Sequence, residues 1–234
     1  MRYWKGAALS FFALLAACSP PKHAVYTSQH RDYLVNVPWA WSVVTDQEDL
    51  RFTEAVFLGA FDPDFYLGQP SFRISWHKRY ATHKLRDGSL EMYADADDFI
   101  SQTLRDVYGP EYQLVGVNKQ GERVVVREPD DIMVAKQFRA KHFVVLSAGP
   151  AAPGARWGTG ELAGAKLLIN PRMHGYVVVP MASGFYVLVY PATRDGYPRY
   201  SKDFDKLVYS FKPLKDGPAG ADLTQALEGK KFPK

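Results

Sequence analysis

The stretch SFRISWHKRY, residues 71–80, alternates cleanly between apolar and polar side chains. Its apolar members are Phe72, Ile74, Trp76 and Tyr80, and its polar members are Arg73, Ser75, His77 and Arg79. Successive side chains of a β-strand point to opposite faces of the sheet. The pattern therefore predicts a half-buried strand with one face in the core and one in solvent.

Similar signals recur on both sides of this stretch. We expect further strands over residues 33–37, 41–44, 55–61, 113–117, 123–127, 139–147, 175–180 and 185–190. A helix is expected to begin at Asp95-Ala-Asp-Asp98, where acidic residues favour a helix amino end, and to end before Gly109-Pro110. A second helix is expected from about Ser201 to Phe211, with Phe204, Leu207, Val208 and Phe211 buried. The sequence predicts an α+β domain, an antiparallel sheet flanked by helices.

The composition narrows the class of protein. The chain has 234 residues, and aromatic residues make up 14%, which suits a sheet-rich core. Residues 1–17 hold two of the 29 Lys and Arg and none of the 25 Asp and Glu, so the remainder has a net charge of +2. Nucleic-acid binders usually show a strong basic patch or stripe, so we expect no nucleic-acid partner.

The amino terminus has the form of a bacterial lipoprotein signal. Two cations, Arg2 and Lys5, precede a short apolar stretch, which is shorter than the roughly 20 residues of a membrane-spanning helix. Leu15-Ala-Ala-Cys18 then matches the lipobox, in which the cysteine thiol receives the lipid. Cys18 is the single cysteine of the chain. The alternative is an ordinary secretory signal cut after Ala17, with Cys18 incidental.

This signal predicts both the location and the domain limits. A lipidated Cys18 anchors the protein to a membrane of the bacterial envelope, and Ser19 rather than Asp after it favours the periplasmic side of the outer membrane in a Gram-negative cell. We expect residues 1–17 to be the signal peptide, 18–25 a tether, 26–214 the α+β domain and 215–234 a flexible tail. Residues 149–164, rich in Gly, Ala and Pro, are expected to form a loop.

Three short motifs resemble one known family. They are Tyr33-Leu-Val-Asn-Val-Pro38 followed by Trp41, the hairpin strand Gly184-Phe-Tyr-Val-Leu-Val-Tyr190, and the helix end Phe204-Asp-Lys-Leu-Val-Tyr-Ser210-Phe211. Together they resemble the PsbP-like superfamily, and within it the bacterial DcrB-type lipoproteins. The resemblance spans about residues 26–214. It implies an α/β/α sandwich whose members mostly bind partners or assist assembly and are not generally enzymes, which is an analogy at the level of the fold.

The sequence lacks the common catalytic signatures. It has no Gly-x-Ser-x-Gly and no His-Glu-x-x-His pattern, and lipidation occupies Cys18. His77 and His83 are the nearest histidine pair, and we expect solvated strand histidines rather than zinc ligands. Asp95, Asp97 and Asp98 lack the glycine and glutamate of a calcium loop, so helix capping explains them better. We expect no enzyme activity, no metal and no cofactor.

Two features are candidates for binding. If their strands are neighbours, Arg73, His77, Arg79, Arg123, Arg127, Arg139 and Lys141 would gather on one sheet face that could hold an anionic partner. The alternative is a solvated face whose charges are offset by nearby acids. Trp157 lies in the glycine-rich loop and is a candidate contact residue, or an ordinary packing residue.

The hypothesis that follows is an envelope lipoprotein with a non-catalytic binding or assembly role, whose partner is a protein or another envelope component. Two alternatives stay open. One is a small-ligand-binding lipoprotein with an aromatic pocket, and the other is a hydrolase with an unrecognised site.

Overall fold

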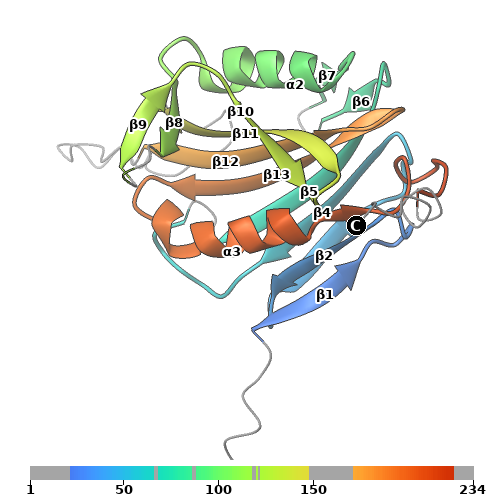
Figure 1. The fold of residues 1–234 in the computed structure, drawn as a ribbon, viewed down its shortest axis with the longest axis horizontal. Coiled ribbons are helices and arrows are strands. Elements are labelled where there is room, and N and C mark those ends of the chain that lie inside the picture. The colour runs from blue at the N-terminus through green and yellow to red at the C-terminus, as the bar shows by residue number, and fades with distance from the viewer. Residues whose placement is uncertain are drawn as a thin grey trace, which may run out of the picture.

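The computed structural model describes residues 22–65, 68–85, 88–117, 120, 122–147 and 171–223. A large antiparallel sheet forms the centre of this part of the chain (Figure 1). Its strands in spatial order are β3 (Ser42–Asp46), β4 (Phe52–Leu58), β5 (Ser71–Lys78), β13 (Gly184–Thr193), β12 (Arg172–Pro180), β11 (Phe138–Ser147), β8 (Gln113–Val117) and β9 (Arg123–Val126). In addition, β10 (Asp130–Val134) pairs with the first half of β11.

A second, smaller sheet packs against one end of the large one. It consists of β1 (His23–Thr27), β2 (Tyr33–Pro38) and β14 (Lys212–Pro213), with β2 in the middle. Two very short strands, β6 (His83–Lys84) and β7 (Leu90–Glu91), pair with each other beyond the end of β5. Every strand pair among the described residues is antiparallel.

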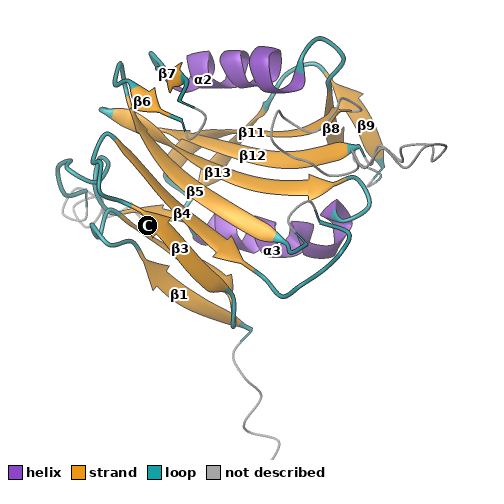
Figure 2. Ribbon diagram, turned by 180° about the vertical axis from the view of Figure 1, so that it is seen from behind, coloured by secondary structure: helices purple, strands orange, loops and turns teal. Residues whose placement is uncertain are grey.

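The helices lie on opposite sides of the large sheet (Figures 1 and 2). Helix α2 (Ala96–Gln102) begins where the Asp95 carboxylate accepts a hydrogen bond of 2.9 Å from the Asp98 amide, and it continues as the π-helix η1 (Thr103–Tyr108). Helix α3 (Tyr197–Ser210) begins with a proline in its first turn, where the missing N–H costs nothing. The capping role expected for Asp95 is confirmed.

One side of the large sheet, here called the α3 face, carries Ile74 of β5 and Leu188 of β13 and is covered by α3 and the small sheet. Its core is rich in aromatic rings, with Phe72 5.5 Å from Phe204 and Tyr186 5.2 Å from Phe211. The buried helix residues Phe204, Leu207 and Val208 are those expected from the sequence.

The other side, the α2 face, carries Phe185 and Val187 of β13 and packs against Phe99 and Ile100 of α2. Tyr176 of β12 and Phe143 of β11 extend this second core, and their stacked rings lie 4.9 Å apart. With helices on both faces, the expected α+β class, an antiparallel sheet between helices, is confirmed.

The expectation of a half-buried strand at residues 71–80 is wrong in one respect. Phe72, Ile74 and Trp76 lie in the α3-face core as expected, but Ser75 and His77 are also buried because α2 covers the second face. Tyr80 follows the end of β5 with a φ of 55° and is 70% exposed, so it does not join the core.

The ordered chain extends past both expected domain limits. Strand β1 begins at His23, inside the segment 18–25 expected to be a tether, because pairing with β2 satisfies its backbone groups. At the other end, Lys215 and Asp222 form a β-bridge, and Gly217 packs so closely on Trp76 that no Cβ would fit. Residues 215–223 of the expected tail are therefore part of the fold, and the expected signal peptide, Cys18 and residues 224–234 lie outside the described residues.

Candidate functional site

The seven residues of the expected basic surface do not share one face. Arg73 and His77 point to the α2 face with Val189 and Phe185, their partners across the strand pair. Arg123 is an odd number of residues from Val126, which packs on the α2-face core, so its side chain points the opposite way. The strands β13 and β12 also separate β5 from β11.

Several of these cations already form an ion pair or a hydrogen bond within the protein. The Arg73 Nε is 3.2 Å from Glu54 Oε1, and the Lys141 Nζ is 2.9 Å from Asp131 Oδ1. Arg79 donates a hydrogen bond of 3.2 Å to the carbonyl of Met181. Arg139 is exposed on β11, and Arg127 lies just beyond the end of β9. The geometry therefore gives a dispersed set of charges rather than one anion site.

His77 is not the solvated histidine expected from the sequence. Its ring lies 5.2 Å from Phe185 and nearly parallel to it, and 5.5 Å from Phe99. Burial lowers the pKa of His77 to about 3, because the charged imidazolium would lose its hydration among these rings. His77 is therefore a neutral core residue.

The structure places a serine and three titratable groups around His77. Ser75 Oγ lies 3.1 Å from His77 Nε2, and Glu91 Oε1 lies 3.9 Å from His77 Nδ1. The same Glu91 oxygen is 2.9 Å from His83 Nδ1, and its second oxygen accepts a hydrogen bond of 2.7 Å from Tyr93. Burial removes the Tyr93 hydroxyl from water and, together with the nearby Glu91, raises the pKa of Tyr93.

This arrangement places a hydroxyl next to a neutral imidazole and a carboxylate, which are the groups of a nucleophile–base pair. However, the carboxylate is too far from His77 for a hydrogen bond, and Ser75 is only 5% exposed. A nucleophile must reach its substrate, so the geometry favours a packing role for this cluster.

A second buried polar cluster lies on the α2 face near the start of β12. The Tyr108 hydroxyl is 2.6 Å from both His174 Nδ1 and the Tyr176 hydroxyl, and the guanidinium of Arg172 lies 5.1 Å from the centre of the Tyr108 ring. Burial, followed by the charge of Arg172, lowers the pKa of His174 to about 3. The sequence does not predict this cluster, because the strand is expected only over residues 175–180 and the partner residue Tyr108 comes from η1.

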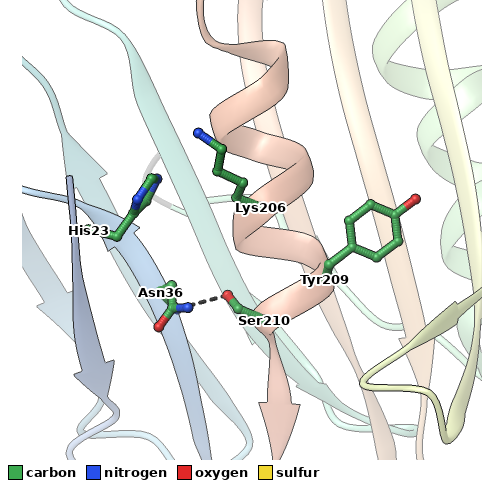
Figure 3. Close-up of a pocket in the computed structure, with 5 residues that line it drawn as sticks. All are labelled: His23, Asn36, Lys206, Tyr209 and Ser210. Atoms are coloured by element: carbon green, nitrogen blue, oxygen red, sulfur yellow. Dashed lines mark hydrogen bonds between the residues drawn. The ribbon is translucent and has the colours of Figure 1, made fainter.

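A surface groove runs between the small sheet and α3. Its volume is about 360 Å³, and it is lined by His23, Asn36, Lys206, Tyr209 and Ser210 (Figure 3). The Asn36 amide donates to Ser210 Oγ at 2.9 Å, which ties β2 to the end of α3. Asp203 lies beside the groove, 3.0 Å from Lys206 Nζ and 3.5 Å from His23 Nε2. The groove thus offers both a cation and an anion to a small polar ligand.

The second accessible feature is the free edge of the large sheet at β3. All five residues of this strand are exposed, including Val43 at 45% and Val44 at 56%. One side of β3 pairs with β4, and no described strand pairs with the other. An unpaired strand edge presents a row of backbone donors and acceptors that another chain can use.

The remaining site predictions are not resolved by the geometry. Cys18 and Trp157 lie outside the described residues. Within the described part of the chain, no three His, Cys, Asp or Glu side chains converge in a way that would hold a metal ion. Among the helices there, none has the length and hydropathy needed to cross a bilayer.

No family model matches this sequence, and no curated protein sequence matches it. Solved structures with a similar fold include a protein from Bacteroides thetaiotaomicron, with a TM-score of 0.44 and 9% identity over 84% of this chain and 50% of that one. The chain thus spans half the length of that protein.

Two further structures are matched over nearly their whole length. A Pseudomonas aeruginosa protein of unknown function has a TM-score of 0.42 and 13% identity over 82% of this chain and 98% of that one. The solution structure of cyanobacterial PsbP from Synechocystis has a TM-score of 0.42 and 12% identity over 84% of this chain and 96% of that one. Membership of the PsbP-like superfamily stays a prediction.

Proposed function

We propose that this chain is a lipid-anchored protein of the bacterial envelope that binds another protein or envelope component without catalysing a reaction. The observation that carries the proposal is the open edge at β3, an accessible surface with unpaired backbone groups. The groups that come nearest to catalytic geometry, Ser75 and His77, are buried and have no such access.

The anchor is supported by the sequence around Cys18. The lipobox Leu15-Ala-Ala-Cys18 precedes the first described strand by only a few residues, since β1 begins at His23. A chain segment of five residues spans at most about 17 Å. A lipid on Cys18 would therefore hold β1 and the adjacent groove close to the membrane surface.

The anchor is tested by expressing the full chain in a Gram-negative host with radiolabelled palmitate. We expect label on the wild-type protein and its recovery in the outer-membrane fraction, and neither for Cys18→Ala. Unlabelled wild-type protein, cleaved after Ala17 and released into the periplasm, would contradict the anchor and support an ordinary secretory signal.

The binding role is tested by crosslinking the native protein in its own membrane and isolating it. We expect one stable partner, recovered at near-constant ratio from independent preparations and lost from preparations of Cys18→Ala. Recovery of the chain alone under several crosslinkers of different length would contradict a binding role.

The groove at β1, β2 and α3 favours a second candidate function, the binding of a small polar ligand. Lys206 and Asp203 present opposite charges there, which suits a zwitterionic group. Titration of the full chain with phosphoethanolamine, followed by the NMR shifts of Asn36 and Ser210, tests this idea. Shifts in the wild-type protein that are absent from Lys206→Gln would support the idea. A wild-type spectrum that does not change during the titration would contradict it.

A further inference from the structure

The edge strand β3 has few of the devices by which proteins usually protect a sheet edge, and its one charged residue, Asp46, stands at its end. Such devices include lysine or proline on the edge, a β-bulge or a very short strand. The sequence of β3 is SVVTD, with no lysine or proline, and its register with β4 runs from Ser42 to Asp46 without interruption. The opposite end of the sheet is less open, because β9 has four residues and begins with Arg123.

The surroundings of β3 differ strongly between its two ends. Near its amino end lie the exposed rings of Trp39, at 51% exposure, and Phe61, at 80% exposure and three residues beyond the end of β4. At its carboxyl end lie the exposed acids Asp46 and Glu48, and neither makes an ion pair with a residue in the described part of the chain. The edge is therefore apolar at one end and acidic at the other.

This asymmetry specifies a binding mode and a partner. Every strand pair of the described chain is antiparallel, so an added strand that continues this pattern places its amino end beside Asp46 and Glu48. Basic side chains there would meet two unpaired carboxylates, and apolar side chains further along would meet Val44 and Trp39. Added strands gain affinity from backbone hydrogen bonds and specificity from alternate side chains.

We propose that β3 binds, as an added antiparallel strand, an extended segment of a partner protein that carries basic residues followed by alternating apolar ones. The inference rests on the proposed binding function and names the chemistry of the partner. A second copy of this chain fits less well, because antiparallel pairing of two β3 strands would place the acidic end of each beside the apolar end of the other.

The experiment is a titration of the full-length chain in detergent micelles with labelled nine-residue peptides. The first has two lysines followed by alternating valine and threonine, the second has glutamates in place of the lysines, and the third is the first sequence reversed. We expect the first peptide to bind at least tenfold more tightly than the other two. Hydrogen exchange of the amides of residues 42–46 should slow on binding.

Charge-swapped variants make the test decisive. The double variant Asp46→Lys, Glu48→Lys changes two exposed positions, so it should retain the fold. This variant should bind the glutamate peptide more tightly than the lysine peptide. The matched control, Glu128→Lys with Asp130→Lys, adds the same charge at exposed positions near β10 and should leave the preference unchanged.

Equal binding of the lysine and glutamate peptides would overturn the proposal. So would the same response in the charge-swapped and control variants, amide protection confined to another segment, or a stable dimer that buries β3. Each of these results would leave the palmitate labelling and the membrane crosslinking unaffected, so a failure here is distinct from a failure of the proposed function.

Discussion

The two faces of the large sheet are both buried, but the side chains that fill their cores differ. On the α3 face, aromatic rings such as Phe72, Phe204 and Tyr190 pack against one another, and the helix that covers them has 14 residues. On the α2 face, the core includes the imidazoles of His77 and His174, and the helix α2 of seven residues that covers it continues as η1 of six residues. The α3-face core contains more buried residues, whereas the α2 face holds the two histidines whose pKa values are lowered to about 3.

The largest expected effect comes from a deletion in the α3 face. Phe204 is 1% exposed, and Phe204→Ala should lower the free energy of unfolding by about 3–5 kcal/mol, because it removes buried surface and leaves a cavity. Urea denaturation followed by circular dichroism measures the loss. Tyr209→Ala on the same helix is the control, since Tyr209 is 67% exposed and its loss should cost less than about 0.5 kcal/mol.

Acid should destabilise the protein through the α2 face. The pKa values of His77 and His174 are about 3 in the folded state, below the ordinary histidine value of 6.5, so the unfolded state binds more protons between these two values. The contribution of these two groups to stability is therefore complete well above pH 6.5 and falls as the pH drops toward 3. The two groups together should cost about 3 kcal/mol by pH 5.5.

The pH dependence separates the two faces when His77→Gln is compared with the wild type. Glutamine retains a polar group near Ser75 but does not titrate, so about half of the loss between pH 6.5 and 5.5 should disappear. Denaturant midpoints measured across this range test the prediction. An unchanged slope would mean that His77 is not the titrating group, and the contrast between the faces would fail.

How far the sequence predicts these faces depends on the range of the interactions. The alternation of residues 71–80 predicts which side of β5 holds Phe72 and Ile74, because that information is local to the strand. Whether the opposite side meets solvent depends on where α2 packs. The residues around His77 do not predict this packing. Arg123 does not lie on the same face as Arg73 for a related reason. The pairing of β9 with β8, which the sequence of β9 does not predict, determines the face to which Arg123 points.

A smaller effect tests a polar contact that lies on the α3 side. The Tyr186 hydroxyl donates a hydrogen bond of 2.7 Å to Asp32, whose side chain is buried, and burial together with this carboxylate raises the pKa of Tyr186. Tyr186→Phe removes the donor and should cost about 1–3 kcal/mol, because Asp32 loses a partner it cannot replace with water. Thermal or urea unfolding at pH 7 measures the cost. A neutral result would show that water reaches Asp32 after all.

The smallest effect is expected where the α2 face opens to solvent. Arg73 and Glu54 form an ion pair there, but the Arg73 side chain is 49% exposed, so solvent screens the attraction. Glu54→Gln should change the free energy of unfolding by less than about 1 kcal/mol. A loss comparable to that of Tyr186→Phe would indicate that this part of the face is more enclosed than its exposure suggests.

The position of β2 has a consequence for the order in which the chain can complete its fold. One neighbour of β2 is β1, which directly precedes it, and the other is β14, at residues 212–213. Because the chain is synthesised from its amino end, β2 is made long before its second neighbour. Leu34 and Tyr33 have no pairing partner on that side until Lys212 and Pro213 have been made, so the sheet that contains β1 is closed last.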